Sequence, residues 1–232
     1  MRVKLVIACA LVVAGCSGSR TEAPPASSPE LPIAWYQDAA RRGDAVYRLD
    51  PAASLLTVFV YREGPLAKLG HDHVVASRDL QGFAAWSPDG AIARADIRLT
   101  VGTLTVDDPE LRARAGFESE PSADDISGTR GNMLKSVDAD AYPNILGQVT
   151  LLRPPPDARV SIELNWHDLT HTYELPIDLH RSAERIEAYG SFELRQSDFG
   201  IEPFSVFGGA LSVADKLDVT ISLRGTRIET VP

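Results

Sequence analysis

The segment KLDVTISLRG, residues 216–225, alternates apolar and polar side chains over its whole length. Its apolar positions are Leu217, Val219, Ile221 and Leu223. Because successive side chains of a β-strand point to opposite faces, this period of two predicts a strand with one apolar face and one polar face.

The same alternation recurs along the chain. It is clear in ARADIRLTV (residues 93–101) and in RVSIELNW (residues 159–166). Further strands are expected at residues 54–63, 70–86 (with a bend), 145–153, 172–181 and 185–196. The pattern predicts an all-β fold, an extended eight-stranded antiparallel β-barrel, because a closed barrel leaves no exposed strand edge.

Residues 107–144 interrupt this alternation with acidic residues, prolines and glycines. One short helix is expected to begin after Asp107 or Asp108, and a second one to end before Pro143. So long an excursion inside a barrel is typical of a functional element such as a lid or a plug.

The first 15 residues have the pattern of a lipoprotein signal peptide. Arg2 and Lys4 precede an apolar run at residues 5–13, which is far shorter than the roughly 20 residues that a membrane-spanning helix needs. The sequence VAGC that ends at Cys16 resembles the lipobox of bacterial lipoproteins, in which the cysteine carries the lipid; an ordinary cleaved signal is the alternative. Ser17, directly after this cysteine, resembles the residue found there in lipoproteins exported to the outer membrane.

Residues 16–44 are expected to be a flexible tether rich in Pro, Ser and Ala with a short helical lead-in, and residues 45–232 to be the barrel domain. The chain has two cysteines, Cys9 and Cys16, so no disulfide is expected in the mature protein. Its net charge of −9 falls to −11 when Arg2 and Lys4 are removed, which argues against nucleic acid as a partner.

The stretch AKLGHDHVV, residues 67–75, places His71 and His73 on one face of an expected strand. Two histidines alone leave a metal ion incompletely coordinated, so a metal site would need a further ligand from His167 or His171. A polar contact at the mouth of a pocket is the other interpretation of the pair.

Five blocks in the globular part resemble the YceI-like family of lipid- or polyisoprenoid-binding barrels, in the order in which that family has them. The first block contains Asp50-Pro51, the second contains Leu69-Gly70 and Gly82-Phe83, and the third contains Lys135-Ser136 and Tyr142-Pro143. The fourth is the hairpin IELNWHDLTHTYELPIDL at residues 162–179, and the fifth has the sequence DFGI at residues 198–201. The chain departs from the family in the hairpin at residues 167–171, which here contains two histidines.

The resemblance implies a barrel that is lipocalin-like in plan and whose apolar interior holds an isoprenoid or another long-chain lipid. It implies no catalytic residue and no cofactor, and we expect no enzymatic activity. The side chains expected to face the ligand are Phe59, Tyr61, Ala95, Ile97, Val149, Ile162, Leu164, Ile177, Phe192 and Leu194, with His71 and His73 at the mouth.

Three functions follow from these observations. The first is a lipid-anchored carrier or reservoir for a long apolar molecule in the bacterial cell envelope, attached to the outer membrane and facing the periplasm. The second is a metal-binding protein that uses His71 and His73 with His167 or His171. The third is an envelope-stress lipoprotein whose acidic excursion contacts a partner. The sequence leaves the choice between a monomer and a dimer open.

Overall fold

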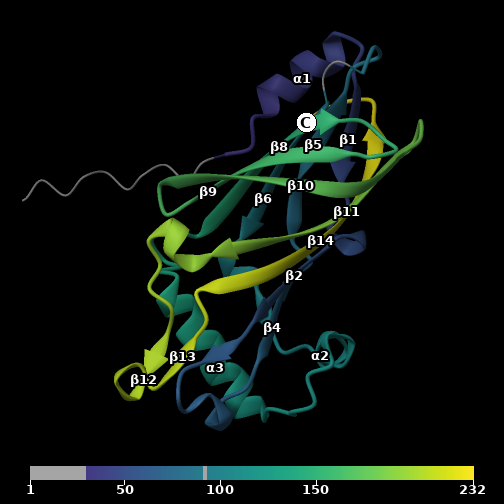
Figure 1. The fold of residues 1–232 in the computed structure, drawn as a ribbon. Helices are drawn as coiled ribbons and strands as arrows, with labels where there is room; N and C mark the ends of the chain where they lie inside the picture. The colour runs from purple at the N-terminus through teal and green to yellow at the C-terminus, as the bar shows by residue number, and fades with distance from the viewer. Residues whose placement is uncertain (1–29, 91–92) are drawn as a thin grey trace, which may run out of the picture.

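The computed structural model describes residues 30–90 and 93–232 (Figure 1). The predicted signal segment, Cys16 and residues 17–29 of the predicted tether lie outside the described residues. The helices are α1 (Ile33–Arg41), α2 (Pro109–Ala115) and α3 (Ala123–Ser136). The strands are β1 (Ala45–Leu49), β2 (Leu55–Val60), β3 (Arg62–Glu63), β4 (His73–Ser77), β5 (Leu80–Trp86), β6 (Ala93–Thr100), β7 (Thr105–Val106), β8 (Asn144–Arg153), β9 (Arg159–Trp166), β10 (Leu169–Arg181), β11 (Arg185–Arg195), β12 (Ser205–Val206), β13 (Leu211–Val213) and β14 (Lys216–Ile228).

Eight of these strands close into an antiparallel ring. The order around the ring is β1, β5, β6, β8, β9, β10, β11 and β14, and β14 pairs back onto β1. The predicted eight-stranded barrel is therefore confirmed. Closure gives the strands of the ring neighbours on both sides, which removes the open edges that an exposed sheet would have.

The strand β14, on which the sequence pattern is clearest, connects the ring to an extended lower wall. One of its edges pairs with β11, while the other pairs first with β2, through Asp218–Ser222, and then with β1. The wall continues from β2 to β4 and β7. The bent strand expected at residues 70–86 is observed as β4 and β5, which are separated at Arg78 and Asp79.

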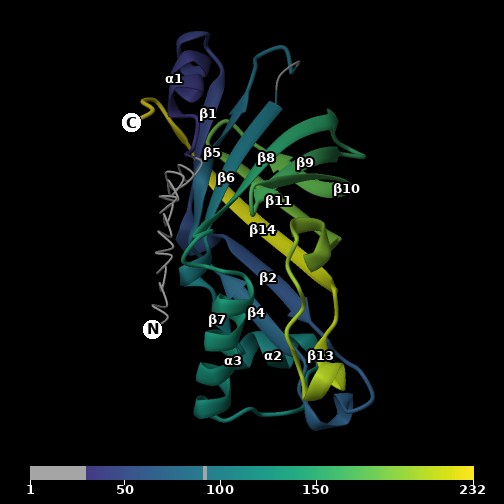
Figure 2. The same ribbon diagram turned by 90° about the vertical axis from the view of Figure 1, so that its left-hand side faces the viewer.

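Helix α1 packs against one end of the barrel (Figure 2). The fully buried Tyr36 hydroxyl lies 2.6 Å from Oδ2 of Asp96 on β6. The last residues of the chain lie against the same helix: Val231 joins the apolar cluster around Tyr36, and Nε2 of Gln37 donates a hydrogen bond of 2.8 Å to the carbonyl oxygen of Pro232. Both terminal segments of the described chain therefore complete this end of the barrel.

The excursion between β7 and β8 contains α2 and α3, as the sequence predicted. Asp108 caps α2 by accepting hydrogen bonds from the backbone N–H groups of Glu110 and Leu111. Helix α3 begins at Ala123, where Ser122 and Asp125 form a capping box, and it ends at Ser136, before Pro143. Ile126 and Met133 pack this helix against the main core.

The end of the barrel that carries α3 has a second, small sheet made of β3, β13 and β12. It joins the two loops at residues 61–72 and 204–214 (Figure 1). None of the described helices combines the length and the apolar composition that crossing a membrane requires.

Candidate functional site

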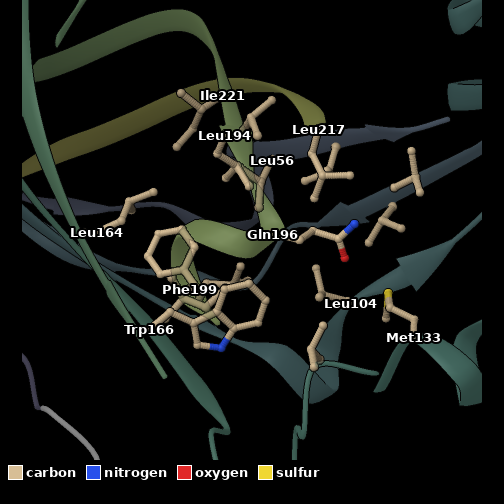
Figure 3. A pocket seen from close by; sticks show the side chains of 18 of the residues that line it. Leu56, Leu104, Met133, Leu164, Trp166, Leu194, Gln196, Phe199, Leu217 and Ile221 are labelled. Carbon is tan, nitrogen blue, oxygen red and sulfur yellow. The ribbon is translucent and has the colours of Figure 1, made fainter. Parts of the chain in front are cut away.

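The barrel encloses a cavity of about 290 Å³ on the side of α3 and the small sheet (Figure 3). Most of its lining is apolar, because every second side chain of the strands faces inward. Strand β2 contributes Leu56, Val58 and Val60, and β14 contributes Leu217, Val219 and Ile221. The volume lies near the lower limit of typical small-molecule sites, about 300–1,000 Å³.

Seven of the residues that the sequence predicted for the ligand site line this cavity. They are His73, Ile97, Val149, Ile162, Leu164, Phe192 and Leu194. They come from five different strands, four of the ring and β4 of the lower wall, which together surround one space.

A second, smaller cavity of about 90 Å³ lies in the barrel interior beyond Val149. Its lining contains two further predicted residues, Ala95 and Ile177. Val149 lines both cavities, so its side chain stands between them. The predicted inward residues are thus divided between two spaces.

Phe59 and Tyr61 do not face the interior, and that prediction is wrong. Val58 and Val60 line the cavity, so Phe59 between them points to the opposite face of β2. The rings of Phe59 and Tyr61 instead pack edge-on against Phe117, which follows α2. Strand β2 is apolar on both faces because α2 covers its outer side, so the alternation could not reveal the register.

One polar group in the cavity wall is held by a buried ion cluster. Nδ1 of His73 lies 2.6 Å from Oδ2 of Asp107, and Nη1 of Arg112 lies 2.6 Å from Oδ1 of the same carboxylate. Asp107 also accepts a hydrogen bond of 3.0 Å from the backbone N–H of Val74. Arg112 further donates to the carbonyl oxygens of Asp72 and Ser119, so its guanidinium is anchored on several sides.

The environment of Asp107 keeps its carboxyl group ionised. Burial by itself would raise the pKa of this group, but the hydrogen bonds from His73, Val74 and Arg112 outweigh burial and hold the pKa below its ordinary value of 3.8. An ionised Asp107 accepts the Nδ1–H of His73, so Nδ1 is occupied and Nε2 is the other ring nitrogen of this lining residue. Sequence reasoning treated Asp107 only as a helix cap and missed this role.

His71 lies outside the cavity, contrary to the sequence prediction. Its ring centroid is 6.3 Å from that of His73, and its side chain is exposed. His71 precedes β4, so the strict alternation expected for the pair does not apply to it.

The other histidines do not complete a metal site with this pair. His167 and Asp168 form the tight turn between β9 and β10 with positive φ angles, and the His167 ring stacks on Tyr142 at 4.1 Å. His171 packs against Phe199. Within residues 30–90 and 93–232, no group of three or more His, Cys, Asp and Glu side chains is placed to hold a metal ion. The condition for the metal-binding alternative is therefore not met in the described chain.

Sequence reasoning also missed several residues of the lining. Met133 and Ser136 reach the cavity from α3, and Trp166 and Phe199 contribute aromatic rings (Figure 3). Gln196 places a carboxamide beside the apolar side chains, and its Nε2 donates a hydrogen bond of 2.9 Å to the carbonyl oxygen of Ala214. To predict where α3 lies, one would have had to recognise its capping box, Ser122 and Asp125, within the excursion.

The exposed members of the cavity lining show where the cavity reaches the surface. Asn132 of α3 and Phe204, which precedes β12, are exposed, whereas the other lining residues are buried or half-buried. The mouth therefore lies between α3 and the segment that leads into the small sheet.

A single closed antiparallel barrel with an apolar cavity defines a lipocalin-like class of fold. The profile of the YceI-like domain matches residues 47–225, which is most of the chain and all eight strands of the ring apart from their outermost residues. The protein belongs to the YceI-like family.

Solved structures of the same kind are similar at low sequence identity. The crystal structure of BcnA from Burkholderia cenocepacia aligns with a TM-score of 0.53 and 13% identity, over 76% of this chain and 98% of that chain. A YceI protein from Campylobacter jejuni aligns with a TM-score of 0.42 and 14% identity, over 64% of this chain and 81% of that chain. A search of curated proteins found no match.

Proposed function

We propose that this protein binds a long apolar ligand, an isoprenoid or another long-chain lipid, inside the barrel as a carrier or reservoir. The observation that carries the proposal is the cavity of about 290 Å³, with its almost wholly apolar lining. Burial of an alkyl chain there is favourable by about 0.8 kcal/mol for each methylene group.

The polar groups in the wall suggest how a head group is oriented. His73 and Gln196 are polar residues among apolar ones, and His73 is held in place by Asp107. A hydroxyl head group that donates a hydrogen bond to Nε2 of His73 would satisfy the imidazole fully. This arrangement supports binding of the ligand and supplies no chemical step.

The location in the cell rests on the sequence. The VAGC stretch that ends at Cys16 supports a lipid-anchored protein at the outer membrane, facing the periplasm. Several acyl chains on one residue would give stable, peripheral attachment.

The excursion favours the ligand-binding role over the role of a contact surface for a partner. Met133, Ser136 and Val137 of the excursion line the cavity, so this segment encloses the interior.

The proposal is tested by extracting and identifying, by mass spectrometry, whatever co-purifies with the protein without an affinity tag. We expect a long-chain amphiphile in the wild type and much less of it in Val58→Trp, which fills the cavity. Phe59→Trp, a change at the neighbouring outward position, is the matched control. Wild-type protein that is empty and also fails to take up added long-chain alcohols would refute the proposal.

A further inference from the structure

Four large apolar side chains are exposed together at the end of the barrel that carries the small sheet. They are Leu66 and Leu69 in the loop after β3, and Phe204 and Phe207 in the loops around β12; together they are called the apolar tip. Leu69 is 70% exposed and Phe207 is 74% exposed. Large apolar side chains that cluster on a surface mark sites of contact with a protein or a membrane.

The apolar tip has a defined structure, because its two loops are hydrogen-bonded to each other. The backbone N–H of Leu66 donates a hydrogen bond of 2.8 Å to the carbonyl oxygen of Ala210. A Cβ atom on Gly64 would lie 2.6 Å from that same oxygen, so the two chains approach too closely for any side chain there. Strand β13 pairs with both β12 and β3, which joins the loops further.

Phe207 has a backbone conformation that is costly for its residue type. Its φ angle is +53°, in the left-handed region, and Gly208 and Gly209 after it also have positive φ angles. Strain of this kind is usual where it serves a function. The exposed ring packs into no core, so packing within the protein does not account for the strain.

The apolar tip is continuous with the mouth of the cavity. Phe204 belongs to the tip and also lines the cavity, and Val213 of the small sheet lines it as well. A chain that leaves the cavity at this mouth would therefore pass over the tip.

We propose that the apolar tip inserts into the surface of a lipid bilayer and that the ligand moves between the bilayer and the cavity at this point. Ligand transfer, the second part of this inference, rests on the proposed function, whereas membrane insertion does not. Four projecting apolar side chains suit shallow insertion at the boundary between the lipid head groups and the acyl chains. They fall well short of the roughly 800 Å² that each partner buries in a stable dimer. Lys68 between the two leucines adds an exposed cation, which is common in segments that lie at membrane interfaces.

Insertion is tested on the full chain by replacing Phe207 with Trp and adding phosphatidylcholine vesicles whose acyl chains are brominated. We expect the additional tryptophan emission of Phe207→Trp to be quenched by at least half, because the indole reaches the acyl chains. The control is Leu152→Trp on β8, where the wild-type leucine is 50% exposed outside the tip. Absence of quenching in Phe207→Trp, or equal quenching in the control, would overturn insertion. Insertion would also be overturned if the wild type formed a dimer in solution and the double variant Leu69→Ser/Phe207→Ser did not.

Transfer is tested by the rate at which the protein takes up a pyrene-labelled long-chain alcohol from phosphatidylcholine vesicles. We expect Leu69→Ser/Phe207→Ser to slow uptake at least tenfold and to leave the equilibrium affinity for the alcohol unchanged. The matched control is Leu152→Ser/Leu169→Ser, at leucines that are 50% and 43% exposed elsewhere. An unchanged rate in the tip variant would overturn transfer at the tip. A wild type that binds no alcohol would count against the proposed function and against transfer, while the quenching result would still decide insertion.

Discussion

Nδ1 of His73 and Oδ2 of Asp107 lie 2.6 Å apart, and this contact joins the wall of the cavity to the excursion that encloses it. On the other side of the carboxylate, Arg112 of α2 is also 2.6 Å away. One buried anion thus fixes both a cavity residue and a helix.

Replacing Asp107 with Asn should destabilise the fold by about 3–5 kcal/mol, because it leaves the buried Arg112 without its counter-charge. Urea unfolding followed by circular dichroism measures this loss. Asp157→Asn, at an exposed carboxylate in the loop between β8 and β9, should change stability by less than about 0.5 kcal/mol. Equal stability of Asp107→Asn and the wild type would show that the ion cluster contributes little to the free energy of unfolding.

The same carboxylate predicts a pH dependence of stability. The pKa of Asp107 is lower in the folded protein than its ordinary value of 3.8, so its contribution is complete above that value and is lost as the pH falls through the folded pKa. The stability difference between the wild type and Asp107→Asn should therefore shrink as the pH falls below about 4. A difference that grows on acidification would contradict the direction of the shift.

The two faces of the barrel wall predict different effects for two phenylalanines. Phe192→Ala should weaken the binding of a saturated long-chain alcohol about tenfold, because the ring lines the cavity. Phe59→Ala should leave the affinity unchanged and lower stability by about 1–2 kcal/mol, because its half-buried ring packs against Phe117 outside the cavity. Isothermal titration calorimetry and urea unfolding measure the two effects, and a reversed pattern would refute the register of β2.

Val149 should limit the length of the chain that the barrel accepts. For the wild type, affinity should rise about fourfold for each added methylene and then level off when the larger cavity is full. Val149→Ala should move this plateau to longer chains, because it opens a path to the smaller cavity. Val58→Ala, which enlarges only the larger cavity, is the control. A plateau at the same length in Val149→Ala and the wild type would show that the two spaces stay separate.

Gly82 should tolerate no side chain. A Cβ atom there would lie 2.1 Å from the backbone oxygen of Asp96 on the neighbouring strand β6. Gly82→Ala should therefore reduce stability by about 3 kcal/mol or more, as measured by thermal or urea unfolding. Gly102→Ala has open space around it and should be nearly neutral. A stable Gly82→Ala variant would mean that β5 and β6 are spaced more widely than described.

The sequence was most informative where one face of a strand is apolar and the other polar. In β14, Val219 and Ile221 alternate with Thr220 and Ser222, so the register and the inward face could be predicted. In β2 the sequence LLTVFV is apolar on both sides, and the choice between Val58 and Phe59 depended on α2, which the pattern of β2 does not reveal.

The ion cluster lay beyond sequence reasoning for another reason. His73 and Asp107 are 34 positions apart and meet only because β4 pairs with β7. The candidate metal pair was suggested by spacing alone, and spacing cannot reveal that His71 precedes the strand in which His73 lies.

The contact between α1 and residues 231–232 also bears on where a recombinant fragment should begin and end. The family profile covers residues 47–225, but Tyr36 and Val231 share one apolar cluster outside both of these bounds. A recombinant fragment trimmed to the profile would leave Asp96 without the Tyr36 hydroxyl and would expose Phe83 and Ala85 beneath it. Expression boundaries taken from the family profile would therefore yield a barrel with exposed apolar surface at one end, which favours aggregation. Fragments for biochemical work should begin before Leu31 and run to Pro232.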